Sequence, residues 1–192
     1  MDLKTLYASE FEEHTAVMAA TRDQLLEPFS QLIDQAVTCI RAGGKILFFG
    51  NGGSAADCQH LATELTIRFK KDRAPIAAIA LTTDTSALTA CGNDLGFDEI
   101  FARQIEALAR PGDLCLGIST SGNSENVIRG LAQAKKIGAT PAALGGKGGG
   151  RMNDYATPYL VVPSDTTARI QEMHIMIGHM FCDALERELK LV

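Results

Sequence analysis

The sequence has few of the features that mark secreted, membrane-spanning or nucleic-acid-binding proteins. Its 192 residues carry 18 Lys and Arg against 23 Asp and Glu, and no basic stripe supports a nucleic-acid groove. No apolar run approaches the ~18 residues of a membrane span. The N-terminus lacks the basic and apolar regions of a signal peptide. We therefore predict a cytoplasmic protein with no membrane or nucleic-acid partner.

The cysteines do not suggest a disulfide framework. The five cysteines are odd in number, scattered, and mostly set in apolar surroundings: Cys39, Cys58, Cys91, Cys115 and Cys182. This usage is typical of reduced core residues in a cytoplasmic protein. With 46% hydrophobic residues, the chain can form a full core without such links, and its length favours a single domain over 1–192.

The most informative stretch begins with a continuous apolar run from Ile46 to Phe49, which predicts a strand buried on both faces. Three glycines then allow a tight turn and close approach of a ligand to the backbone: Gly50, Gly52 and Gly53. Ser54 is predicted to cap the helix that follows. The unpaired N–H groups of its first turn would make an anion site.

The same helix carries His60 and Glu64, which are four residues apart and so share one face. We interpret them as a metal or acid/base pair within two or three turns of the anion site. A solvated helix face is the ordinary alternative.

Apolar strands alternate with helices along the rest of the chain. We expect strands at 45–49, 75–81, 114–118, 140–144 and 159–162, and helices at 54–69, 85–91, 99–109, 125–136 and 167–189. This order predicts an α/β fold with a parallel sheet covered on both faces, where ligands bind beyond the carboxyl ends of the strands. Two further helices are expected before the first strand, at 2–19 and from Pro28 to Ile40. We therefore predict that residues 1–42 pack against another subunit and that residues 43–192 form the αβα core.

A second loop, Ser119-Thr120-Ser121-Gly122-Asn123-Ser124, follows the third strand and opens a helix. Its hydroxyls and the helix N–H groups suit the oxygens of a phosphoryl group. An ordinary capping turn is the alternative, although a cap needs only one such residue.

The first loop also matches a dinucleotide-binding pattern, which alone is a weak signal. That interpretation requires an acidic residue ~20 positions on, whereas Asp84 lies 30 positions beyond Ser54. No lysine follows the glycines, so the loop is not a Walker loop.

Together, the loops Gly50–Ser54 and Ser119–Ser124 resemble those of the sugar isomerase (SIS) domain family. Three further features resemble its phosphoheptose isomerase branch: His60-Leu-Ala-Thr-Glu64, Gly92-Asn93-Asp94, and Arg169–His174 followed by His179. The resemblance covers nearly the whole chain. It implies a three-layer αβα sandwich with a five-stranded parallel sheet (the SIS fold) and a homotetramer.

The resemblance also implies the roles of individual residues. Glu64 and His179 would be the catalytic acid/base pair. Substrate would contact Asn51, Gly52, Gly53, Glu64, Asn93, Asp94, Ser119, Thr120, Ser121, Ser124 and Gln171. Zinc would be bound by His60, Glu64, Gln171 and His179. Without the resemblance, His179 would be interpreted as a core histidine and Gln171 as a polar core residue, while His174 is assigned a structural role.

The spacing of two of these ligands poses a geometric problem. Gln171 and His179 are eight residues apart on one presumed helix, a rise of about 12 Å, whereas two ligands of one tetrahedral ion end only ~3–4 Å apart. Either the side chains lean together or one comes from a neighbouring subunit.

The loop after the fourth strand departs from the family pattern. It reads Gly145-Gly146-Lys147-Gly148-Gly149-Gly150, where the family more often has a Thr in the first part and an Asp before the last glycines. We predict a more mobile loop and an effect on closure over the substrate.

The resemblance implies an aldose–ketose isomerase that converts D-sedoheptulose 7-phosphate into D-glycero-D-manno-heptose 7-phosphate through an enediol(ate), for lipopolysaccharide precursors. The alternatives are a non-catalytic SIS protein that binds the replication initiator, whose members lack the acid/base pair, and a sugar-phosphate-sensing SIS domain, for which no DNA-binding segment is attached.

Overall fold

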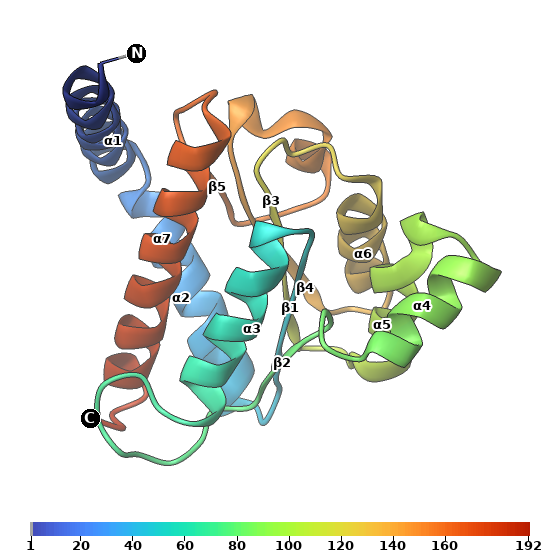
Figure 1. Ribbon diagram of the computed structural model, residues 1–192. Helices are drawn as coiled ribbons and strands as arrows, with labels where there is room; N and C mark the ends of the chain where they lie inside the picture. The colour runs from blue at the N-terminus through green and yellow to red at the C-terminus, as the bar shows by residue number, and fades with distance from the viewer. Residues whose placement is uncertain (1) are drawn as a thin grey trace.

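The computed structural model describes residues 2–192 and contains one five-stranded, all-parallel sheet between layers of helices (Figure 1). The strand order is β2-β1-β3-β4-β5. The strands are β1 (Ile46–Gly50), β2 (Ala78–Ala80), β3 (Leu114–Ser119), β4 (Thr140–Gly145) and β5 (Tyr159–Val161). This arrangement confirms the three-layer sandwich, since the alternation of apolar strands and helices requires crossovers that cover both faces.

The helices divide between the two faces of the sheet. They are α1 (Leu3–Gln24), α2 (Leu26–Arg41), α3 (Gly53–Thr66), α4 (Thr85–Asp94), α5 (Ile100–Leu108), α6 (Glu125–Lys136) and α7 (Thr167–Glu188), with 3-10 segments η1 (Phe97–Glu99) and η2 (Lys147–Asp154). Helices α2, α3 and α7 form one core with the sheet, and α5 and α6 form the other.

Strand β1 shows why both cores form. Ile46 and Phe48 point into the core under α3 and α7, while Leu47 and Phe49 point into the core under α5 and α6. All four side chains are fully buried. Because successive side chains alternate faces, the continuous apolar run serves both cores at once.

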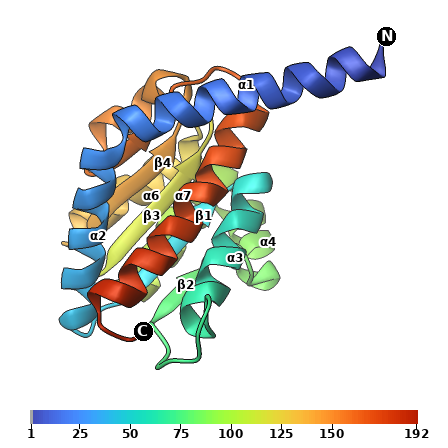
Figure 2. The ribbon, with the colours of Figure 1, turned by 90° about the vertical axis from the view of Figure 1, so that its left-hand side faces the viewer.

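The N-terminal helices differ from the sequence expectation. Helix α1 continues beyond the expected end at residue 19 to Gln24, and α2 begins at Leu26, so only Leu25 separates the two helices. Only Thr21 of α1 is buried, and the helix extends past the body of the molecule (Figure 2). None of the helices within residues 2–192 combines the length and apolar character needed to cross a membrane.

Strand β2 is shorter than the expected 75–81. It pairs only with β1 and lies at the edge of the sheet. The N–H of Ile76 donates to the carbonyl of Leu65 in α3, at 3.0 Å, instead of to a strand. The five cysteines are free, and all but Cys91 are buried, as their apolar surroundings predict.

Candidate functional site

The sheet register brings the two predicted loops side by side. Gly50 at the end of β1 pairs with Ile118, and Ser119 at the end of β3 pairs with Gly145 of β4. The loops at 50–53 and 119–124, which we call the rim, therefore meet at the carboxyl edge of the sheet, where ligands bind in open α/β sheets.

The first loop of the rim ends at an uncapped helix. Gly52, with φ +56°, occupies the N-cap of α3, and no side chain caps this end. The prediction that Ser54 caps the helix is wrong: Ser54 lies inside the first turn and is buried, and a Cβ at Gly50 would come within 2.9 Å of the Ser54 Cβ. The first N–H groups of α3 are left without a side-chain acceptor, as an anion site requires.

The second loop repeats this arrangement. Ser124 occupies the N-cap of α6, yet its side chain does not cap the helix. Its Oγ instead lies 2.9 Å from the Oγ of Ser119, which lies 3.4 Å from the Oγ of Ser121. Three hydroxyls thus gather beside a helix N-terminus, and Thr120 between them is half-buried. Neutral donors of this kind fit the oxygens of a phosphoryl group.

A pair of amides joins the two loops. The Asn51 Nδ2 donates to the Asn126 Oδ1 at 2.8 Å, and the Asn126 Nδ2 donates to the Asn51 Oδ1 at 2.9 Å. Asn126 is almost fully buried on α6. The sequence reasoning missed it, although an Asn in the first turn of a helix behind a serine loop was a possible signal.

The predicted acid/base residues converge between α3 and α7. The Nε2 atoms of His60 and His179 lie 2.9 Å apart, and Glu64 Oε1 lies 3.4 Å from His60 Nε2. At 2.9 Å, one ring nitrogen donates a proton to the other. We call His60, Glu64 and His179 the imidazole–carboxylate cluster.

Two neighbours shape this cluster and were not foreseen. The ring of Phe69 stacks on His179, with centroids 5.5 Å apart and planes 27° apart, and shields one imidazole face. Burial raises the pKa of the Asp57 carboxyl, an effect that the nearby His60 and His179 oppose. No sequence pattern predicted a role in the site for Phe69 or Asp57.

Gln171 lies beside the rim. A Cβ at Gly53 would come within 2.7 Å of the Gln171 Nε2, so this amide lies against the first turn of α3. His60 follows Gly53 by seven residues, a rise of about 10 Å along α3. Among residues 2–192, no hydrogen bond joins Gln171 to the imidazole–carboxylate cluster.

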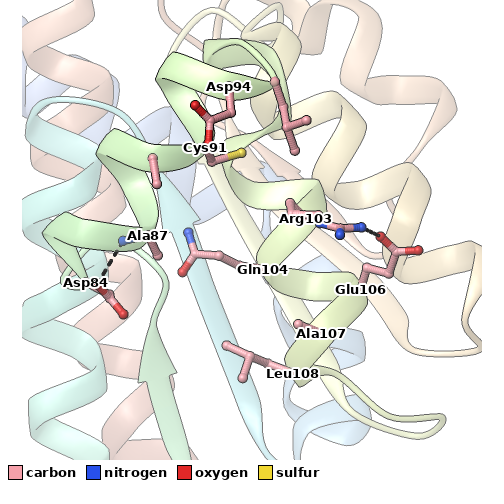
Figure 3. Close-up of a pocket in the computed structure, with 11 residues that line it drawn as sticks. Asp84, Ala87, Cys91, Asp94, Arg103, Gln104, Glu106, Ala107 and Leu108 are labelled. Carbon is pink, nitrogen blue, oxygen red and sulfur yellow. Dashed lines mark hydrogen bonds and ion pairs between the residues drawn. The ribbon is translucent and has the colours of Figure 1, made fainter.

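Asn93 and Asp94 lie on the last turn of α4 and are exposed. The Asn93 Nδ2 donates to the Asp94 Oδ1 at 2.7 Å. Asp94 lines a wide hollow of about 660 Å³ between α4 and α5, where Arg103 pairs with Glu106 at 2.8 Å (Figure 3).

That hollow contains no other predicted site residue. A smaller depression, of about 170 Å³, adjoins the rim. It is lined by Gly50, Asn51, Gly52, Ala55, Thr82, Leu88, Phe97, Ile100 and Phe101. We assign the site to the rim and the cluster, because their residues can supply both phosphate contacts and acid/base groups.

The donor set of the imidazole–carboxylate cluster fits zinc. Two imidazole nitrogens and a carboxylate are a common set of three protein ligands at catalytic zinc. The described residues contain no three His, Cys, Asp or Glu side chains already arranged around a common point at metal-binding distance. The two Nε2 atoms lie 2.9 Å apart and the Glu64 Oε1 lies 3.4 Å from the His60 Nε2.

Comparison with known proteins agrees with this geometry. The model of the SIS domain family matches residues 11–146. A phosphoheptose isomerase from Paramagnetospirillum magneticum is 55% identical over 186 residues, which cover 97% of each chain.

Two solved structures extend the similarity to three dimensions. The phosphoheptose isomerase of Neisseria gonorrhoeae superposes with a TM-score of 0.91 at 44% identity, over 97% of this chain and 100% of that one. The phosphoheptose isomerase of Francisella tularensis gives 0.93 at 38% identity, over the same shares. The chain belongs to the phosphoheptose isomerase family of SIS-domain proteins and is a sugar-phosphate isomerase.

Proposed function

We propose that this enzyme interconverts D-sedoheptulose 7-phosphate and D-glycero-D-manno-heptose 7-phosphate. The observation that carries the proposal is the position of the imidazole–carboxylate cluster on α3 and α7, about two turns from an uncapped, hydroxyl-rich rim. Family membership supports the same reaction. One end of the site suits a phosphate, and the other suits proton transfer.

In this mechanism the rim holds the phosphate. The hydroxyls of Ser119, Thr120, Ser121 and Ser124 and the first N–H groups of α6 are its donors. The loop at Asn51, Gly52 and Gly53, with Gln171 beside it, contacts the sugar hydroxyls. We also assign sugar contacts to Asn93 and Asp94.

The chemistry belongs to the cluster. Glu64 removes a proton from C1 of the ketose and returns it to C2 through an enediol(ate). His179 shuttles a proton between the oxygens on C1 and C2, or assists ring opening. Atoms balance, because the reaction only relocates two protons within the substrate.

We further propose that zinc binds at His60, Glu64 and His179. When bound, the ion would polarise the substrate carbonyl as a Lewis acid. Glu64 must then divide its two oxygens between the ion and the proton. Gln171 as a fourth ligand remains a prediction, which requires its side chain to move or to come from another copy of the chain.

Assembly as a homotetramer is also a proposal. Helix α1 supports it, because its apolar side chains Leu3, Leu6, Tyr7 and Phe11 are 40–71% exposed. Exposed apolar clusters of this kind mark association surfaces. We propose a cytoplasmic enzyme that supplies heptose for lipopolysaccharide precursors.

The decisive experiment is incubation of the purified protein with sedoheptulose 7-phosphate, followed by detection of an aldose product, with and without a chelator. An aldose product supports the isomerase, and its loss with the chelator and return with zinc support the metal. A protein that binds the sugar phosphate and forms no aldose would instead support the non-catalytic or sensing alternatives.

A further inference from the structure

The glycine-rich segment after β4 lies against the serine loop of the rim. A Cβ at Gly122, where φ is +64°, would overlap the carbonyl of Gly149. The N–H of Met152 donates to the Gly122 carbonyl, and the N–H of Arg151 donates to the Asn123 Oδ1, both at 3.0 Å. The position of the serine loop therefore depends on the position of η2.

One side chain from β5 holds this segment. The hydroxyl of Tyr159 donates to the carbonyl of Gly149 at 2.8 Å. The same hydroxyl would lie 2.9 Å from a Cβ at Gly122, so it is in the layer between η2 and the serine loop. Burial raises the pKa of Tyr159 to about 12, so the hydroxyl remains a proton donor across the physiological range.

The Tyr159 ring fits in this position because Gly145 has no side chain. A Cβ at Gly145 would lie 2.7 Å from the Tyr159 Cζ and would overlap its hydroxyl. Gly145 is also the residue of β4 that pairs with Ser119. The glycine at 145 and the tyrosine at 159 thus fit together.

We propose that Tyr159 is a positioning residue for phosphate binding. Its hydroxyl holds the Gly149 carbonyl against Gly122 and so fixes the hydroxyls of Ser119, Ser121 and Ser124 in the arrangement that receives a phosphate monoester. The inference rests on the proposed function in one respect, namely that the rim takes the phosphate of the substrate. It assigns no contact between Tyr159 and the sugar.

The test compares Tyr159→Phe with a matched control, Tyr155→Phe. Both tyrosines pack against the same core, but the Tyr155 hydroxyl has no hydrogen-bond partner within residues 2–192. Inorganic phosphate is titrated into each protein by calorimetry. We expect Kd to rise about three- to tenfold for Tyr159→Phe, the range for one lost hydrogen bond, and to stay unchanged for Tyr155→Phe. KM for the sugar phosphate should rise by the same factor, with kcat within about twofold.

A second variant, Gly145→Ala, displaces the tyrosine from the other side. Its effect on phosphate affinity should match that of Tyr159→Phe. The double variant should bind phosphate as tightly as either single variant, because all three lose the same hydrogen bond. A merely structural role would lower the melting temperature and leave phosphate affinity unchanged.

Wild-type affinity for phosphate in Tyr159→Phe would overturn the inference. The proposed function fails separately, if the wild-type protein binds phosphate but yields no aldose from sedoheptulose 7-phosphate. A wild-type protein with no affinity for phosphate would overturn the inference alone, because the aldose assay tests the proposed function separately.

Discussion

The two halves of the site, the rim and the imidazole–carboxylate cluster, differ in the chemical groups that they present. The rim consists of backbone N–H groups, hydroxyls and a reciprocal pair of amides, and its hydroxyls and amides are already bonded to one another. The imidazole–carboxylate cluster consists of titratable side chains on α3 and α7. The proposed function assigns binding to the rim and proton transfer to the cluster, so substitutions in the rim should change affinity and those in the cluster should change the rate.

The helix starts show how the rim is kept open to an anion. At α4, the carboxylate of Asp84 accepts the N–H of Ala87 at 2.9 Å, so this end is already occupied by a negative charge. At α3 and α6 no side chain caps the helix. In the proposed binding mode, the phosphate takes the place at α6 that Asp84 takes at α4, and the sugar oxygens meet the first N–H groups of α3.

The largest expected effect separates the two halves at Glu64. Glu64→Gln keeps the shape of the side chain but removes the carboxylate proposed as the base, so kcat should fall about a thousandfold. Phosphate affinity should stay within about twofold, since the rim is untouched. Steady-state kinetics and phosphate calorimetry measure the two effects. Glu12→Gln on α1, at an exposed position, is the control. Retained turnover would remove Glu64 from its role.

Substitution of Gly122 tests the rim, with Gly112 as the matched control. Gly122 and Gly112 both have positive φ, at +64° and +87°, but a Cβ at Gly112 meets nothing within 4 Å, whereas one at Gly122 overlaps Gly149. Gly122→Ala should cost roughly 3–4 kcal/mol of unfolding free energy and weaken phosphate binding more than tenfold. Gly112→Ala should cost only about 1–2 kcal/mol and leave affinity unchanged. Denaturant unfolding and phosphate titration of both variants provide the comparison, which equal losses of affinity would contradict.

A third imidazole, that of His174, is fully buried, whereas His60 is exposed and His179 is half-buried. His174 lies under the rim and donates its Nε2 proton to the Gly145 carbonyl at 3.0 Å, and burial lowers its pKa to about 4. In the unfolded chain the His174 imidazole is protonated as pH falls through about 6.5, whereas in the folded chain it stays neutral until about pH 4. Stability from this residue is therefore complete above pH 6.5 and falls, by about 3 kcal/mol, as pH drops to 4.

The variant His174→Gln should flatten that part of the stability curve. Denaturant unfolding between pH 4 and 7.5 measures it, and turnover near neutrality should keep its pH dependence, because His174 takes no part in the chemistry. If the unfolding free energy of the variant changed with pH as steeply as that of the wild type, another group would be responsible for the pH dependence.

The sequence predicted most of the fold for a simple physical reason. A run such as Ile46–Phe49 is typical of a strand in a covered parallel sheet, and in such a sheet glycines and serines that follow the strands lie at one edge. The pairing of Ser119 with Gly145 came from the structure, because the register depends on tertiary packing. The wrong predictions concern the ends of helices and strands, whose positions depend on tertiary contacts. Ser54, for example, was predicted to cap α3 but lies in its first turn, packed against Gly50.

The cluster was only partly predictable. Spacing places His60 and Glu64 on one face, but the approach of His179 depends on how α7 packs against α3, which no local pattern encodes. The same holds for Asn126 and Tyr159, whose partners lie 75 and ten residues away in sequence.

The smallest expected effect tests the cluster alone. Phe69→Leu removes the ring that stacks on His179 but keeps an apolar side chain, and the loss of such stacking is worth about 0.5–1.5 kcal/mol. We expect kcat to fall about three- to tenfold with phosphate affinity unchanged, since Phe69 lies beside the cluster and not at the rim. Phe69→Tyr keeps the ring and should keep the rate. A loss of phosphate affinity in Phe69→Leu would mean that the two halves are coupled through α3, because that helix is the element they share.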